Sequence, residues 1–289
     1  AEGDRLAFST DSYVIDPLFF PGGNIGKLAI CGTANDVAVS GAIPRYLSCG
    51  FILEEGLPME TLKAVVTSMA ETARAAGIAI VTGDTKVVQR GAADKLFINT
   101  AGMGAIPANI HWGAQTLTAG DVLLVSGTLG DHGATILNLR EQLGLDGELV
   151  SDCAVLTPLI QTLRDIPCVK ALRDATRGGV NAVVHEFAEA CGCGIEISEA
   201  ALPVKPAVRG VCELLGLDAL NFANEGKLVI AVERNAAEQV LAALHSHPLG
   251  KDAALIGEVV ERKGVRLAGL YGVKRTLDLP HAEPLPRIC

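Results

Sequence analysis

A chain of 289 residues is long enough for about two domains of ordinary size, and 49% of its residues are hydrophobic, which is enough for a sizeable core. The net charge of −9 and the lack of any cluster of Lys and Arg exclude a protein that binds nucleic acid, whose phosphates need such clusters. No apolar run approaches the ~20 residues of a membrane span, and no signal peptide opens the chain. We therefore expect a cytoplasmic protein with no nucleic acid or membrane partner.

The first 112 residues alternate between strand-like and helix-like patterns and are expected to form one domain. A helix is expected over Pro58–Ala76, because Pro suits its first turn and Gly77 its end. The other expected elements are a strand over Leu6–Thr10, a helix over Gly26–Ser40, and strands over Arg45–Leu53, Ala79–Thr82 and Lys95–Ile106.

A second domain is expected over residues 113–275, after the stretch Pro107–Ala119, which has no periodic pattern. Two α+β units in series, each a mixed sheet with helices, is the simplest architecture for this order of elements. Strands are expected over Asp121–Ser126, Val169–Arg173, Ile195–Ile197, Lys227–Val232, Ala254–Val260 and Val265–Ala268, and helices over Ala134–Leu143, Val180–Cys191, Val204–Leu215 and Ala236–His245.

Residues 276–289 form a tail that carries Pro280, Pro284 and Pro286 and has no amphipathic period. Proline favours extended backbone, and at roughly 3.1 Å per residue the tail can reach about 40 Å. We therefore expect a flexible, extended segment that ends in Cys289.

The other cysteines are interpreted as structural, because a core-rich chain of this size does not need a disulfide framework. Apolar stretches contain four of them, and a free Cys in such a stretch behaves as a small buried hydrophobe. These four are Cys31, Cys49, Cys168 and Cys212. Cys191 and Cys193 lack a second ligand pair at zinc-finger spacing, so we interpret them in the same way.

Three aspartates indicate a site for Mg²⁺ and a polyphosphate. Asp11 and Asp84 each follow a strand-like run, where the plain alternative is a turn or a helix cap. Asp36 instead lies on a helix face of small and polar side chains that includes Thr33, with Asn35 alongside. A charged object is expected to approach the backbone there. Mg²⁺ needs a few hard oxygen ligands and leaves its other positions to phosphate.

The common nucleotide loops, GxxxxGK[ST] and GxGxxG, are both absent. The Gly-rich run Ser126–Gly133 between a strand and a helix is interpreted as a packing turn, with a phosphate cradle as the alternative. Lys86 lies two residues after Asp84. If the strand continues that far, both side chains project from the same face, and Lys86 supplies a cation to the carboxylate cluster.

Two motifs of the second domain have both a structural and a functional interpretation. The run Asp174–Gly179 is either a helix start capped by Thr176 or an anion site formed by Arg177 and the helix N-terminus. Glu225 precedes an apolar strand, so it is either a turn residue or a base whose pKa is raised by burial.

Over essentially its whole length, the sequence resembles the HypE family of hydrogenase-maturation proteins, within the AIR-synthetase (PurM-like) superfamily. The aspartate motifs are common to the superfamily, whereas the terminal Pro-Arg-Ile-Cys is particular to HypE. The motifs that carry the resemblance are Ser9–Tyr13, Ala34–Ala38, Thr82–Lys86, Asp174–Gly179, Asn224–Gly226 and Pro286–Cys289. Family members begin with a glycine-rich segment that has no counterpart before Leu6, so we expect part of the nucleotide site to be missing.

The resemblance implies a PurM-like two-domain fold and a homodimer in which the first-domain sheets meet and the nucleotide lies near the interface. It implies that the partner HypF loads a carbamoyl group onto the Cys289 thiol, and that ATP-dependent dehydration then produces an S-cyano group. The cyano group passes to the iron of the [NiFe]-hydrogenase site on a HypC–HypD scaffold.

Under this resemblance ATP and Mg²⁺ are the cofactors, because dehydration of an amide needs its oxygen converted into phosphate, a better leaving group. The implied Mg²⁺ ligands are Asp11, Asp36 and Asp84, and the implied nucleotide contacts are these three with Asn35, Thr85 and Arg177. The implied catalytic residues are Cys289 as carrier, Glu225 as the base and Lys86 as the group that orients the substrate or stabilises charge.

Two other functions remain open at this stage. One is another ATP enzyme of the superfamily, such as selenophosphate synthetase, thiamine-phosphate kinase or AIR synthetase, none of which needs a terminal thiol. The other is a non-catalytic carrier, in which Cys289 is modified by other proteins and the rest of the chain is a docking module.

Overall fold

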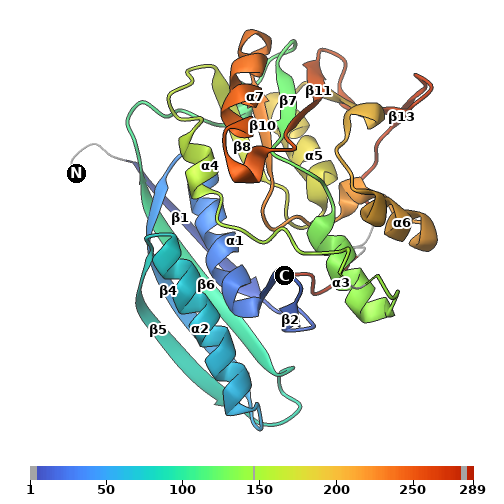
Figure 1. The fold of residues 1–289 in the computed structure, drawn as a ribbon. Coiled ribbons are helices and arrows are strands. Elements are labelled where there is room, and N and C mark those ends of the chain that lie inside the picture. Colours follow the sequence, from blue (N-terminus) through green and yellow to red (C-terminus); the bar gives the residue numbers. More distant parts are fainter. Residues whose placement is uncertain (1–4, 146, 281–284) are drawn as a thin grey trace.

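The computed structural model describes residues 5–145, 147–280 and 285–289, and these residues form two large sheets and one small hairpin (Figure 1). In the first sheet the strand order is β1-β6-β4-β5, with β6 antiparallel to both of its neighbours and β5 parallel to β4. These strands are β1 (Arg5–Tyr13), β4 (Ile43–Glu54), β5 (Ala79–Val88) and β6 (Leu96–Ile106).

Helices α1 (Ile25–Val39) and α2 (Met59–Ala75) lie on one face of this sheet, and we call the other face the open face (Figure 1). The hairpin of β2 (Phe19–Phe20) and β3 (Gly23–Asn24) leads into α1. The side chain of Asn24 caps α1, accepting hydrogen bonds from the backbone N–H groups of Gly26 at 2.9 Å and Lys27 at 3.1 Å.

Small residues on α1 allow it to approach the sheet closely. A Cβ atom at Gly32 would lie 2.4 Å from the Tyr13 hydroxyl, which no real side chain tolerates. Beside this contact, the hydroxyls of Tyr13 and Thr33 hydrogen-bond at 3.0 Å, and those of Thr33 and Thr100 at 2.6 Å. The small polar face of α1 is therefore packed against β1 and β6. The expectation that a ligand approaches the backbone there was wrong at Thr33, because the sheet occupies that space.

The second sheet has seven strands in the order β13-β12-β9-β11-β7-β10-β8. All its pairs are antiparallel except β12 with β9. Its strands are β7 (Val122–Val125), β8 (Val169–Asp174), β9 (Gly194–Ser198), β10 (Leu228–Val232), β11 (Ala254–Val260), β12 (Gly264–Ala268) and β13 (Lys274–Thr276).

Both faces of this second sheet are covered. Helix α5 (Gly179–Cys191) packs on one face, and α4 (Thr157–Gln161) and α7 (Ala237–His245) pack on the other. Every residue of β7 and β10 is consequently buried, which explains their unbroken apolar sequences. The remaining helices are α3 (Asp131–Glu141) and α6 (Pro206–Leu215), with short 3-10 turns over Ala114–Thr116, Glu199–Ala201, Ala219–Asn221, Arg234–Ala236 and Pro248–Gly250.

A single apolar cluster joins the two units. It contains Tyr13 and Leu28 from the first unit, Ile136 of α3 and Phe222 from the second, and Ile288 from the end of the chain. In Figure 1 the C-terminus accordingly lies beside α1, α3 and β2, between the two sheets. The described residues contain no helix that is long and apolar enough to cross a membrane.

The predicted α+β architecture is confirmed, with some differences in detail. β1 and β5 extend beyond their predicted ends, because the β6 and β4 ladders continue to pair them, so Asp11 and Asp84 lie inside strands and not after them. Helix α4, only five residues long, had no detectable period. Cys168 lies in the turn before β8 and is only partly buried, as is Cys212.

Candidate functional site

The site begins with two carboxylates on the covered side of the first sheet. Asp11 of β1 faces α1, and Asp36 of α1 accepts a hydrogen bond from the Ser9 hydroxyl at 2.8 Å. Burial raises the pKa of Asp11, and the charge of Asp36 adds to this rise. Arg177 approaches Asp11 to 3.9 Å, and Arg173 approaches Asp36 to 3.7 Å. The structure thus brings Asp11, Asp36 and Arg177 together.

Asp174 is a third carboxylate at this place, although it was not among the site residues predicted from the sequence. It ends β8, is 3% exposed and lies 3.5 Å from the Arg173 guanidinium. Burial and the neighbouring charge of Asp36 raise the pKa of Asp174 to about 7. An Asp at the end of a buried strand, directly before a Gly-rich turn, was the signal that could have identified it.

The turn after Asp174 leads into α5 without a side-chain cap. Gly178 is the residue before the helix and has φ of +74°, and Gly179 follows with φ of +60°. A Cβ at Gly179 would lie 2.4 Å from the carbonyl oxygen of Leu220, so the position requires glycine. Of the two interpretations of this run, the cap by Thr176 is not found, because its backbone carbonyl accepts the N–H of Gly179.

Glu225 is 2% exposed, and its Oε1 atom has no hydrogen-bond partner among the described residues. Burial raises the pKa of Glu225 well above its usual value, and the nearby Cys153, Asp152 and Asp174 raise it further. An unpaired, buried carboxyl oxygen next to other acidic groups is a costly arrangement, and such groups concentrate at functional sites.

Asp152 fixes the backbone around Glu225. Its carboxylate accepts the N–H groups of Glu225 and Gly226, both at 3.1 Å, and the Lys227 ammonium at 3.2 Å. Burial alone would raise the pKa of Asp152, but the charge of Lys227 and these hydrogen bonds lower it overall. Asp152 thus stays charged and holds Glu225 in place. No sequence signal identified it, because Asp152 lies 73 residues before Glu225 in an irregular segment.

Asp84 and Lys86 lie elsewhere. Residues that are paired across the strands of a sheet project from the same face. Asp84 is paired through Gly50 and Asn99 with Ser12, the residue after Asp11, and neighbouring residues of a strand project from opposite faces. Asp84 therefore projects from the open face, whereas Asp11 projects from the covered face. The two are also on opposite edge strands, about 14 Å apart at the usual spacing of three strand intervals.

Lys86 and Asp84 form a 3.0 Å ion pair, as their shared strand face predicted, and both side chains are about 70% exposed. Thr85 lies on the other face of β5, against α2. Within one chain the structure therefore does not bring Asp84 and Lys86 together with Asp11 and Asp36. The alternating faces of the sheet separate these residues.

Asn35 is buried, and both polar atoms of its amide are hydrogen-bonded within the chain. Its amide nitrogen donates to the Ala154 carbonyl at 3.0 Å, and its amide oxygen accepts the N–H of Leu156 at 2.8 Å. It is 1% exposed and ties α1 to the segment before α4. These bonds give Asn35 a structural role, and its contact with the nucleotide stays a prediction.

The Gly-rich run before α3 is a packing turn, as the sequence analysis favoured over a phosphate cradle. The Gly130 N–H donates to the Asn224 side chain at 2.7 Å, and the Thr128 hydroxyl donates to Asp131 at 2.6 Å. A Cβ at Gly133 would contact Phe222 at 3.0 Å. These contacts fill the space that a phosphate would need.

The residues fit Mg²⁺ only when another molecule supplies ligands. Among the described residues, no three His, Cys, Asp or Glu side chains converge well enough to hold a metal ion. Asp11 and Asp36 are two hard carboxylates on the same side of the sheet, and Mg²⁺ is commonly held by one or two carboxylates together with substrate phosphates. These two residues would hold the ion if a polyphosphate bound beside them.

The end of the chain reaches this neighbourhood. Cys289 is 7% exposed, and its carbonyl accepts the N–H of Val14 at 2.9 Å. Val14 follows Tyr13, whose buried hydroxyl has its pKa raised by burial and by the charges of Asp11 and Glu225. The tail was expected to be flexible and extended. In this structure its last residues are instead packed into the core. Pro284 lies outside the described residues.

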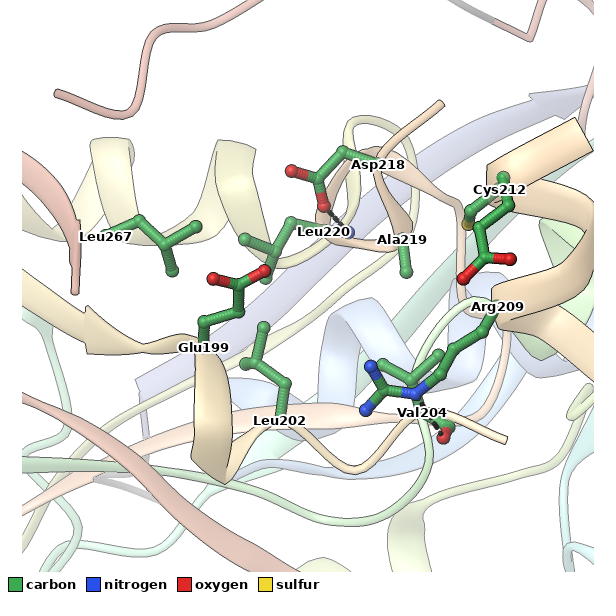
Figure 2. Close-up of a pocket in the computed structure, with 10 residues that line it drawn as sticks. Glu199, Leu202, Val204, Arg209, Cys212, Asp218, Ala219, Leu220 and Leu267 are labelled. Carbon is green, nitrogen blue, oxygen red and sulfur yellow. Dashed lines mark hydrogen bonds between the residues drawn. The ribbon is translucent and has the colours of Figure 1, made fainter. Parts of the chain in front are cut away.

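A separate pocket lies on the second unit (Figure 2). The Arg209 side chain extends toward the Val204 carbonyl, to which it donates, and the Asp218 carboxylate accepts the N–H of Leu220 at 3.0 Å. Glu199, Cys212 and Glu213 complete the polar lining. None of the predicted site residues lines this pocket, so we do not assign the site to it.

Comparison with known proteins places these features in a family. Residues 1–106 match the N-terminal domain of AIR synthase related protein, and residues 118–269 match its C-terminal domain. The curated Carbamoyl dehydratase HypE of Escherichia coli K12 is 99% identical over 289 residues, which are 100% of this chain and 86% of that protein.

Two solved structures are also similar. A HypE in complex with ATP has a TM-score of 0.95 at 47% identity, covering 99% of this chain and 87% of that one. A HypE–HypF complex has a TM-score of 0.93 at 48% identity, covering 96% of this chain and 92% of that one. The two-domain fold and these matches define a member of the AIR synthase related superfamily. The chain belongs, within that superfamily, to the HypE family.

Proposed function

We propose that this chain is an ATP-dependent carbamoyl dehydratase that acts on a carbamoyl group carried by the thiol of Cys289. The observation that supports this most is the position of Cys289. Its backbone oxygen accepts the N–H of Val14, the residue after Tyr13, and the pKa of the Tyr13 hydroxyl is raised by the charges of Asp11 and Glu225. The near identity to the E. coli Carbamoyl dehydratase HypE and the similarity to a HypE that binds ATP support the same reaction.

The reaction needs one activation and the loss of two protons. The carbamoyl oxygen attacks the γ-phosphorus of ATP, ADP leaves, and one N–H proton is lost, which gives an S-imidoyl phosphate. The C–O bond then breaks, phosphate leaves with its electron pair, and the second N–H proton is removed, which gives S–C≡N. Mg²⁺ held by Asp11 and Asp36 would neutralise phosphate charge.

Glu225 is the proposed base for the proton losses. Its free Oε1 atom is available to accept a proton, and its raised pKa keeps it a strong base once it is ionised. Because the ionised form is required, the dehydration rate should rise with pH through the raised pKa of Glu225. The bond network around Asp152 keeps the carboxyl in position.

A two-stage experiment tests the reaction. The chain is first carbamoylated by HypF and purified away from it, then MgATP is added and the C-terminal peptide is followed by mass spectrometry. A carbamoyl adduct on Cys289 that becomes a cyano adduct only with ATP is expected. Glu225→Gln should keep the carbamoyl adduct and ATP binding but form no cyano product, while the exposed control Glu238→Gln should behave as wild type. Normal turnover by Glu225→Gln would remove it as the base. If conversion instead proceeds without ATP, the chain is a carrier and not the enzyme.

We further propose a homodimer in which the open faces of two first-unit sheets pack together. Phe8, Met103 and Tyr46 form one aligned apolar row across β1, β6 and β4, and their side chains are 68%, 41% and 51% exposed. An aligned apolar row of this kind on a sheet is typical of a protein interface. Phe8→Asp should give a monomer in sedimentation, and an unchanged sedimentation coefficient would refute this interface.

The dimer gives a place for Asp84 and Lys86, which project from the same open face. We propose that they serve the site of the opposite subunit, which restores the predicted set of Asp11, Asp36 and Asp84. Mixing inactive Asp11→Asn and Asp84→Asn chains then gives hybrid dimers with one intact site, and roughly a quarter of wild-type activity. No recovery on mixing would refute this assignment.

For partners, we propose HypF as the carbamoyl source, supported by the similarity to a HypE solved in complex with HypF, and a HypC–HypD complex as the acceptor of the cyano group. We propose a cytoplasmic location, because all eight cysteines are free thiols and a reducing compartment keeps them so. Transfer of labelled cyanide from the charged chain to HypC–HypD tests the acceptor, and retention of the label on Cys289 would refute it.

A further inference from the structure

The last five residues are held in the body chiefly by α3. Arg140 of α3 donates to three backbone carbonyls: Asp16 and Pro286, each at 2.7 Å, and Arg287 at 2.5 Å. Two of these carbonyls belong to the terminal segment 285–289, and the third belongs to the loop after β1. A guanidinium donates several hydrogen bonds in a fixed plane, so Arg140 fastens the segment to the loop in one register.

His132, two turns earlier on α3, holds the next residue. Its Nε2 atom lies 2.8 Å from the Ile288 carbonyl, and its Nδ1 atom lies 2.7 Å from the Ser151 hydroxyl. A carbonyl only accepts, so Nε2 carries the proton and Nδ1 accepts from Ser151. The ring is fully buried, with Phe20 edge-on at 5.3 Å. Burial lowers the pKa of His132, which favours this neutral form.

The held conformation is one that the segment would not adopt unaided. Arg287 has φ of +54°, a left-handed backbone that a residue with a Cβ seldom adopts. Its side chain compensates by donating to the Val14 carbonyl at 2.9 Å and to Asp94 at 2.7 Å. The contacts of Arg140 and His132 are all to backbone carbonyls, so they fix the path of the chain and leave the thiol of Cys289 untouched.

We propose that Arg140 and His132 are positioning residues, which form a latch that places Cys289 for the ATP-dependent step and opens when HypF loads the thiol. The inference rests on the proposed carbamoyl chemistry for its catalytic part. The latch itself is independent of that chemistry, because it predicts how accessible the thiol is in the resting protein.

The first test measures alkylation of Cys289 by iodoacetamide, located on the C-terminal peptide. Arg140→Ala should accelerate it by about tenfold or more, since it removes two charge-assisted hydrogen bonds to the segment. Arg164→Ala is a matched control, because Arg164 also donates to two carbonyls, those of Gly41 and Ala42, both at 2.8 Å, but touches no described residue of the tail. Equal alkylation rates in both variants and wild type would overturn the latch.

A second pair of variants separates the latch from a general loss of packing. His132→Gln keeps an N–H group that can reach the Ile288 carbonyl and should retain most of the protection, whereas His132→Leu keeps the volume but loses the donor and should expose Cys289. Equal exposure in both variants would show that His132 only fills space, and would overturn its assignment.

The catalytic part is tested on carbamoylated, purified chain. Arg140→Ala should lower kcat for cyano formation by about tenfold, with KM for ATP unchanged and with carbamoylation by HypF as fast as in wild type. An unchanged kcat would refute the positioning role while leaving the dehydratase function intact. Absence of cyano product in wild type would refute the function, while the alkylation result would still decide the latch.

Discussion

Ile288 is the most deeply buried side chain of segment 285–289, and its truncation gives a quantitative test of the docked tail. It is 2% exposed and belongs to the cluster that joins the two units. Ile288→Ala removes three carbon atoms, and at ~0.8 kcal/mol for each buried carbon the docked state loses about 2 kcal/mol or more. The segment belongs to no strand or helix, so this loss is expected to undock it and not to unfold the sheets.

A shift of about 2 kcal/mol in the docking equilibrium corresponds to a ~30-fold increase in the exposed fraction of Cys289. Alkylation of Cys289 should accelerate by that factor. The fall in melting temperature should be limited to the part of the stability that docking of the segment contributes. Ile256→Ala, at a fully buried position in β11 outside the cluster that contains Ile288, is the matched control. Ile256→Ala should lower the melting temperature more than Ile288→Ala does, and it should leave the alkylation rate of Cys289 unchanged. If Ile288→Ala does not change that rate, the segment does not dock in solution as described.

Two further predictions concern the packing and charges of the site. Gly32→Ala should destabilise the fold by about 1–3 kcal/mol in urea denaturation, because the new methyl group would collide with the Tyr13 hydroxyl; a neutral result would contradict the close packing of α1. Folding raises the pKa of Asp174 to about 7, so protonation of this carboxyl stabilises the fold. The stabilisation is fully present below the unfolded pKa of ~3.9 and is lost as the pH rises through about 7. The melting temperature of wild type should therefore fall relative to Asp174→Asn between pH 5 and 8, and parallel curves would contradict the raised pKa.

The elements with strong local signals were predicted well. The helix over Met59–Ala75 begins after Pro58 and ends just before the glycine at position 77, as the sequence indicated. The ends of β1 and β5 were predicted less well, because polar residues such as Asp11 and Asp84 resemble turn residues when the neighbouring strand is unknown. Ladder hydrogen bonds to β6 and β4, which are long-range contacts, keep these residues in the strands.

The residue types of the site were also available from the sequence, but their grouping was not. Asp11, Asp36 and Arg177 lie together, whereas Asp84 and Lys86 project from the opposite face. Asp174 was missed because its burial and raised pKa depend on α1, which is far away in the chain.

The sequence by itself determined the two-unit α+β fold, the carboxylate motifs and the terminal cysteine, because hydrophobic period and short motifs are local properties of the chain. The tertiary structure alone decided which carboxylates share a site and where Cys289 lies. The carboxylates are separated because a shift of one residue along a strand reverses the face from which a side chain projects. The docked position of Cys289 depends on Arg140, which lies 149 positions earlier in the chain. Such contacts have no local signature, since they form only when both sheets and α3 are in place.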